Sequence, residues 1–150
     1  ALESLWHEIW HNRQTGMDKA ANLSRYHPVR RFAETLNQAV ARLTYPRFVE
    51  HLGGKAIHQE WVLHHGYGYA LSVARLWRVI GECGLNPKAL AGDLASINRE
   101  EDLMDGSRHL AKLLAKRSGY PQAGIQAALD LLLVVDDVRF AARLGGIRSS

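Results

Sequence analysis

Residues 102–117 read DLMDGSRHLAKLLAKR, and the interpretation of the whole chain begins from this segment. At about 100° per residue, one helical face collects Leu103, Leu110, Leu113 and Leu114. The opposite face carries Arg108, Lys112 and Lys116 at i, i+4 and i+8. The pattern predicts an amphipathic helix that packs one side into a core and displays a row of cations about 6 Å apart on the other.

The composition favours one helical domain. The chain has 150 residues, of which 47% are hydrophobic, which is enough for a substantial core. Long alternating runs of Val, Ile and Thr are absent, and this argues against strands. We therefore expect an all-α fold, a bundle of about seven or eight helices over residues 1–150, with two packed sub-bundles, about 1–84 and 85–150, as an alternative subdivision.

Cysteine usage and hydropathy indicate the compartment. The single cysteine, Cys83, excludes an internal disulfide and a cysteine-only zinc site, and it fits a reducing cytoplasm. No signal-peptide pattern is visible near residue 1, because Glu3, His7 and Glu8 interrupt the apolar residues there. The longest apolar run, residues 131–135, is far too short to cross a membrane. We expect a cytoplasmic protein with no membrane partner.

Residues 7–11 read HEIWH and match the H-E-x-x-H pattern of metalloproteases, in which two histidines bind zinc and the glutamate acts as general base. A helical wheel places His7 and His11 opposite the apolar stripe of positions 2, 5 and 9, and therefore in solvent. A catalytic zinc needs a walled cleft and a third ligand. We predict no metal, no cofactor and no enzymatic activity. A metal-dependent hydrolase that uses His7, Glu8 and His11 is the least favoured alternative.

An excess of basic residues on helix flanks is the most informative functional pattern. Lysine and arginine number 19 against 15 acidic residues, a formal net charge of +4. The acidic residues gather at 100–102, 105 and 136–137, near predicted helix starts, where they suit the helix dipole. Beyond the row in 102–117, the basic residues expected on polar helix faces are Arg31, Arg42, Arg75, Arg78, Arg139 and Arg143. Such charges suit contact with a nucleic-acid backbone, although the same pattern also fits an ordinary solvated surface.

Several segments occur in the order of one known family. An aromatic helix at residues 5–10 precedes GMDKAANLSR at 16–25, which is similar to a motif of glycine followed by basic-Ala-x-Leu-Arg-Arg. Arg25 matches the second arginine of that motif, and Ser24 stands at the first. SVARL at 72–76 and the basic helix beginning near Arg108 follow, and then a Leu-rich helix and a short basic, aromatic one. In this order the chain resembles the small subunit of type I-E CRISPR Cascade complexes.

This resemblance implies an all-helical, non-enzymatic subunit that steadies the crRNA–target assembly and the displaced DNA strand. The implied partners are other Cascade-type protein subunits, crRNA, single-stranded target DNA and a second copy of the chain. The implied nucleic-acid contacts are Arg25, Arg75 and Arg108. We expect these and the cations on the helix faces to converge into one continuous track. The alternative is a helical adaptor whose only partners are proteins and whose exposed aromatic residues form the contact.

Overall fold

The computed structural model of the protein describes residues 2–66, 68–133 and 136–149. Within these ranges the chain forms nine α-helices and two 3₁₀ turns, and its one β-type pairing is an isolated bridge between Thr15 and Asp102. The all-α class is confirmed. The elements are α1 (Leu2–His11), α2 (Met17–Ala21), α3 (Pro28–His51), α4 (Gln59–His65), α5 (Ala70–Glu82), η1 (Pro87–Leu90), α6 (Ala91–Glu100), η2 (Leu103–Asp105), α7 (Gly106–Ser118), α8 (Gln122–Leu129) and α9 (Asp137–Gly146).

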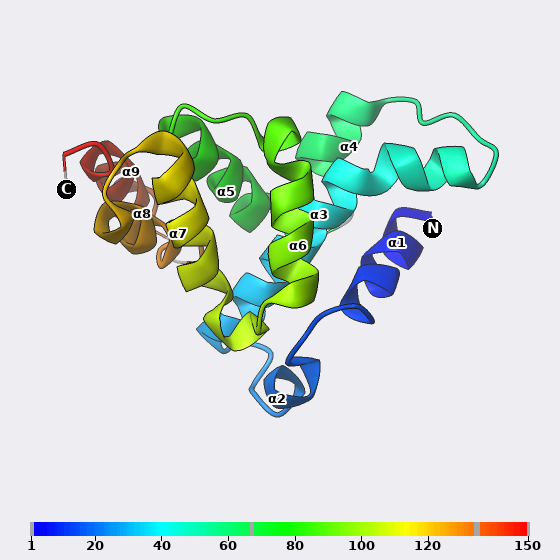
Figure 1. The fold of residues 1–150 in the computed structure, drawn as a ribbon, viewed down its shortest axis with the longest axis horizontal. Coiled ribbons are helices and arrows are strands. Elements are labelled where there is room, and N and C mark those ends of the chain that lie inside the picture. Colours follow the sequence, from blue (N-terminus) through cyan, green and yellow to red (C-terminus); the bar gives the residue numbers. More distant parts are fainter. Residues whose placement is uncertain (1, 67, 134–135, 150) are drawn as a thin grey trace.

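The long helix α3 organises the fold (Figure 1). It runs through the middle of the molecule, with α1 and α4 towards one end and α5, α7, α8 and α9 towards the other. Phe32, Leu36 and Val40 are buried on α3, and so are the polar side chains of Thr35 and Asn37. Neighbouring helices contact α3 on several sides, and this explains why both apolar and polar side chains of α3 are buried.

The start of α3 agrees with the sequence and its end does not. The dipeptide His27-Pro28 predicts a helix start with Pro28 in the first turn, and α3 begins at Pro28. The sequence also predicts that the helix ends at Pro46 and that one separate turn follows over residues 48–52, whereas α3 continues without a break to His51. The ring of Phe48 stacks on Trp6 of α1, with 4.3 Å between the centroids. This packing stabilises the last turns of α3 despite the hydrogen bond that Pro46 cannot make.

Helix α1 turns only part of its predicted apolar stripe to the core, because Trp6 and Trp10 pack there and Leu2 and Leu5 do not. Leu2 and Leu5 are 43% and 50% exposed, whereas His7 is only 2% exposed. The indole nitrogens of Trp6 and Trp10 both donate to Thr44 Oγ1 of α3, at 2.9 and 3.1 Å. The hydrogen bonds to Thr44 therefore set the rotation of α1 about its own axis, and Leu2 and Leu5 face solvent as a result.

Helix α7 bears out the amphipathic pattern of residues 102–117. Leu110 and Leu114 are fully buried on one side, and Arg108, Lys112 and Lys116 are exposed on the other. Leu103 differs from the prediction, because it lies in η2 before the helix begins. There it packs against Ala20 and Ala33 in a small second cluster.

One hydrophobic cluster extends over most of the molecule. It includes Trp10 of α1, Leu36 of α3 and Leu76 of α5, together with Leu114 of α7 and Phe140 of α9. Side chains from both sides of residue 84 thus share a core. None of the described helices combines the length and the hydropathy needed to cross a bilayer.

Candidate nucleic-acid interface

The basic row on α7 is the best-formed of the predicted contacts. Arg108, Lys112 and Lys116 project from one face of the 13-residue helix, about 6 Å apart along its axis. Arg108 lies 3.5 Å from Asp105 in an exposed pair, which screening makes weak. Among the described residues, no carboxylate pairs with Lys112 or Lys116. The row therefore keeps most of its charge available to an anionic partner.

Arg42 was predicted as a surface contact, and the structure contradicts this. Its side chain is buried, and its guanidinium donates to the carbonyl oxygens of Leu63, Gly66 and Gly68 at 3.1, 3.0 and 2.8 Å. Burial lowers its pKa to about 10 and the nearby Glu3 opposes this shift, so the group stays charged at neutral pH. Arg42 thus satisfies carbonyl groups at the end of α4 and is not available to nucleic acid.

Arg75 is a second predicted contact that the structure places in the interior. It is 2% exposed, although the helical wheel puts it outside. Its guanidinium donates to the carbonyl oxygens of Leu131 and Leu132 at 3.4 and 3.3 Å and to Asp137 Oδ1 at 2.8 Å. The same group lies 5.1 Å from the ring centroid of Phe140. Arg75 therefore joins α5 to the turn that follows α8 and to the start of α9.

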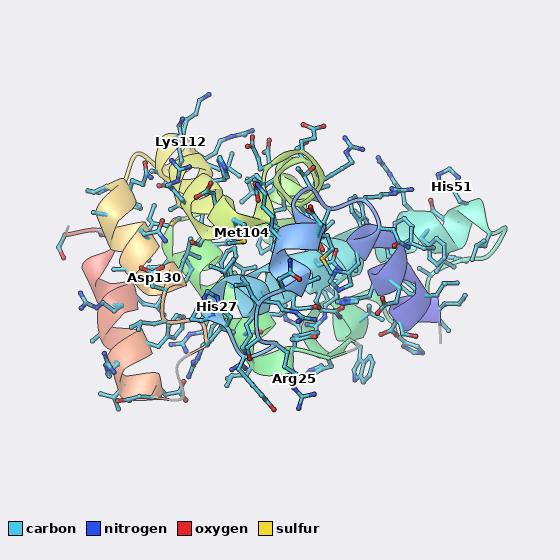
Figure 2. The ribbon with its side chains drawn as sticks, turned by 90° about the horizontal axis from the view of Figure 1, so that it is seen from below. Arg25, His27, His51, Met104, Lys112 and Asp130 are labelled. Atoms are coloured by element: carbon cyan, nitrogen blue, oxygen red, sulfur yellow. The ribbon has the colours of Figure 1, made fainter. Side chains whose placement is uncertain are left out.

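The remaining predicted cations are exposed at the surface. They are Arg25, Arg31, Arg78, Arg139 and Arg143. Arg25, in the segment between α2 and α3, and Lys112 on α7 lie at opposite edges of the molecule (Figure 2). The guanidinium of Arg78 lies 5.1 Å from the ring centroid of Phe140. Because Arg42 and Arg75 are buried and the α7 row stands apart from Arg25, the predicted residues do not all lie on one surface.

A groove that the sequence did not predict lies between α1, the second half of α3 and the start of α6. It encloses about 860 Å³ and combines aromatic rings with basic side chains. The guanidinium of Arg13 lies 5.8 and 5.3 Å from the ring centroids of Trp6 and Trp10. Arg13 follows Trp10 by three residues, which is the local signal for this contact. The other basic side chains that line the groove come from distant positions, Arg47, His51 and Lys88.

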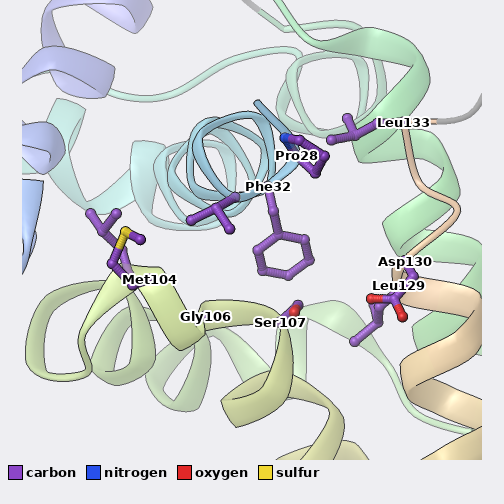
Figure 3. Close-up of a pocket in the computed structure, with 10 residues that line it drawn as sticks. Pro28, Phe32, Met104, Gly106, Ser107, Leu129, Asp130 and Leu133 are labelled. Carbon is purple, nitrogen blue, oxygen red and sulfur yellow. The ribbon is translucent and has the colours of Figure 1, made fainter. Parts of the chain in front are cut away.

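A smaller pocket of about 230 Å³ lies where the start of α3 meets η2, α7 and the end of α8 (Figure 3). The ring of Phe32 faces the first residues of α7, next to Gly106. The walls are mostly apolar, with Met104, Leu129 and Leu133 among them, and Asp130 is the charged residue that lines them. Such a pocket suits an apolar group rather than a phosphate.

The fold and these surfaces define an all-helical protein with a basic helix flank, a basic and aromatic groove and a small apolar pocket. The chain matches no protein-family model, and the comparisons with curated proteins and with solved structures find no similar protein.

Proposed function

We propose that this protein is a non-catalytic, nucleic-acid-contacting subunit that binds single-stranded DNA or RNA through its basic surface. The observation that carries the proposal is the exposed row of Arg108, Lys112 and Lys116 on α7. Phosphates along a nucleic-acid strand repeat at a spacing similar to the helical turn, so one strand can follow the row. On the opposite face of the same helix, Leu110 and Leu114 are fully buried in the core. This packing fixes the orientation of α7, so that the basic row faces solvent.

The groove beside α1 supports the same function. Proteins that bind single strands without sequence preference combine a basic groove with aromatic side chains. Here the guanidinium of Arg13 lies over the rings of Trp6 and Trp10, and Arg47 adds positive charge. Lys88 contributes less, because it is paired with Glu60.

A place in a CRISPR surveillance complex is the finer part of the proposal, and it rests on the resemblance in sequence. In that role the chain contacts crRNA, single-stranded target DNA, other Cascade-type subunits and a second copy of itself. Of the three arginines that the resemblance implies, Arg25 and Arg108 are exposed and fit a contact. Arg75 fits a structural role instead.

The double variant Arg108→Ala, Lys112→Ala tests the α7 row. Each phosphate contact on a single strand contributes about 0.7 to the slope of log affinity against log salt, so the slope should fall by about 1.4. We also expect affinity for oligothymidine at low salt to fall about tenfold, measured by fluorescence anisotropy over a salt series. The matched control is Lys19→Ala, Arg99→Ala, which removes the same charge from residues already paired with Asp102 and Glu100. Unchanged binding in the α7 variant, or equal losses in both, would contradict the proposal.

A helical adaptor with only protein partners is the second candidate. The observation in its favour is the apolar pocket around Phe32, which could receive an apolar side chain of a partner. Gel shifts with single-stranded DNA at two salt concentrations distinguish the candidates. A wild-type protein that shifts no DNA even at low salt would leave the adaptor as the better explanation.

A further inference from the structure

Two histidines and a glutamate meet between α1 and α3. His7 and His11 lie one turn apart on α1, and both Nε2 atoms approach Glu34 Oε2 of α3, at 3.4 and 2.9 Å. The side chains of His7, His11 and Glu34 are 3%, 12% and 18% exposed. The sequence predicts that His7 and His11 face solvent, which argues against metal binding, but both side chains are largely buried between two helices. Glu34 lies beside them and could serve as a third ligand.

A chain of amide groups fixes the proton of His11. Asn37 Nδ2 donates to the backbone carbonyl of His7 at 2.9 Å, a group that only accepts. Asn37 Oδ1 therefore accepts from Asn98 at 3.0 Å, and Asn98 Oδ1 accepts from Gln14 Nε2 at 2.8 Å. The carbonyl oxygen of Gln14 must then face His11 Nδ1, at 2.7 Å, and this nitrogen carries the proton.

The proton on Nδ1 has a consequence for the opposite side of the ring. In a neutral imidazole the other nitrogen, Nε2, is an acceptor. His11 Nε2 nevertheless lies 2.9 Å from a carboxylate oxygen, which is also an acceptor. Two acceptors at this distance repel unless a positive charge lies between them. That charge is either a second proton on His11 or a metal ion.

We propose that His7, His11 and Glu34 form a binding site for one divalent transition-metal ion. Imidazole nitrogen and carboxylate oxygen in the ratio two to one are a known ligand set of zinc with an open fourth position. With bonds of about 2.0–2.1 Å, ligand atoms around tetrahedral zinc stand about 3.3 Å apart, close to the 3.4 Å between His7 Nε2 and Glu34 Oε2. The 2.9 Å between His11 Nε2 and Glu34 Oε2 is a hydrogen-bond distance, and it lengthens by about 0.4 Å when the ion replaces the proton. Ligand atoms of His7, Glu8 and His11 also lie within 4.8 Å of one another, so the exposed Glu8 is a further carboxylate near the same ion.

The surroundings of the cluster suit a metal. A metal-bound histidine usually donates its second ring N–H to an oxygen, which fixes the ring. Gln14 Oε1 does this for His11, and Gln38 Oε1 lies 2.7 Å from His7 Nδ1. Glu34 also lines a pocket of about 380 Å³ together with Arg25, Tyr26, Arg30, Arg31 and Tyr69. The pocket thus reaches the carboxylate of the site, and its arginines favour an anionic fourth ligand.

Zinc titration of the full chain, after treatment with a chelator, tests the site by calorimetry. We expect one equivalent to bind to the wild type. Glu34→Gln keeps the shape of the side chain but removes the charged ligand, and it should weaken binding at least tenfold, with His11→Ala weaker still. Gln14→Leu, which leaves the three ligands in place, should cost about tenfold through loss of ring orientation. Circular dichroism checks that each variant is folded.

The matched control is His64→Ala. His64 is exposed on α4 and lies 3.9 Å from Glu60 at i, i+4 spacing, so it represents adventitious binding by surface histidines. Its loss should leave the zinc affinity of the high-affinity site within about twofold, since the site lies on other helices. No stoichiometric binding, or binding that His64→Ala removes and Glu34→Gln does not, would overturn the proposal. Either result is independent of the DNA-binding measurements, because the α7 row takes no part in the site.

Discussion

Replacement of Arg75 by methionine is expected to lower the free energy of unfolding by about 3 kcal/mol, one of the two largest effects that we predict. Methionine fills much of the same space but donates no hydrogen bond. The carbonyl groups of Leu131 and Leu132 then lose a charged donor, and Asp137 loses its partner. Hydrogen bonds to a charged group contribute more than neutral ones, and buried acceptors without a donor are costly.

Urea unfolding followed by circular dichroism measures this effect, and Arg78→Met is its matched control. Both arginines lie 5.1 Å from the ring centroid of Phe140, so both variants lose a cation–π contact. Of the two, only Arg75 also donates to the carbonyl oxygens of Leu131 and Leu132. Arg78→Met should therefore lower the free energy of unfolding by at most about 1 kcal/mol. Equal losses in the two variants would show that stacking on Phe140, and not the carbonyl contacts, explains the burial of Arg75.

Glu34→Gln is expected to remove about 2 kcal/mol of stability from the metal-free protein in mildly acidic solution, and less as the pH rises. Burial lowers the pKa of His11, but hydrogen bonds to Glu34 and Gln14 and the charges of Glu34 and Glu8 outweigh it and raise the pKa above 6.5. Burial also raises the pKa of Glu34, and its contacts with His11 and His7 hold it well below 4.5.

The two shifts define the pH range of the effect. Because folding raises the pKa of His11, its protonated ring stabilises the fold fully below pH 6.5. This contribution is lost as the pH rises through the pKa of His11 in the folded protein. The lowered pKa of Glu34 contributes above 4.5 and is lost as pH falls. The wild type should therefore exceed Glu34→Gln most between pH 4.5 and 6.5, measured by urea unfolding with a chelator present. A difference that does not change with pH would mean that no ion pair forms.

Sequence periodicity predicted α7 well because its two faces differ in hydropathy at every turn. Sequence periodicity also predicted that Arg42 and Arg75 face solvent, although both are buried. Both lie on helices whose polar positions meet another helix end, and a guanidinium there can satisfy backbone carbonyl groups. A helical wheel of one segment contains no information about where a neighbouring helix stops.

The candidate sites also divide into one that a local sequence pattern predicts and two that only the tertiary structure forms. The basic row is local, with its members four residues apart, and the sequence located it. The groove brings Arg13 together with Arg47 and Lys88, and the metal cluster brings His11 to Glu34, across separations that no local pattern encodes. His7 and His11 were assigned to solvent because the apolar stripe was assumed to face the core.

The sequence by itself determined the helical class of this protein, the amphipathic helix α7 and the exposure of its cations, because these depend on side chains within a few turns of one another. Only the tertiary structure decided which polar residues are buried and which charges meet. That outcome depends on the rotation of each helix against α3, which is set by partners distant in sequence such as Thr44 for α1.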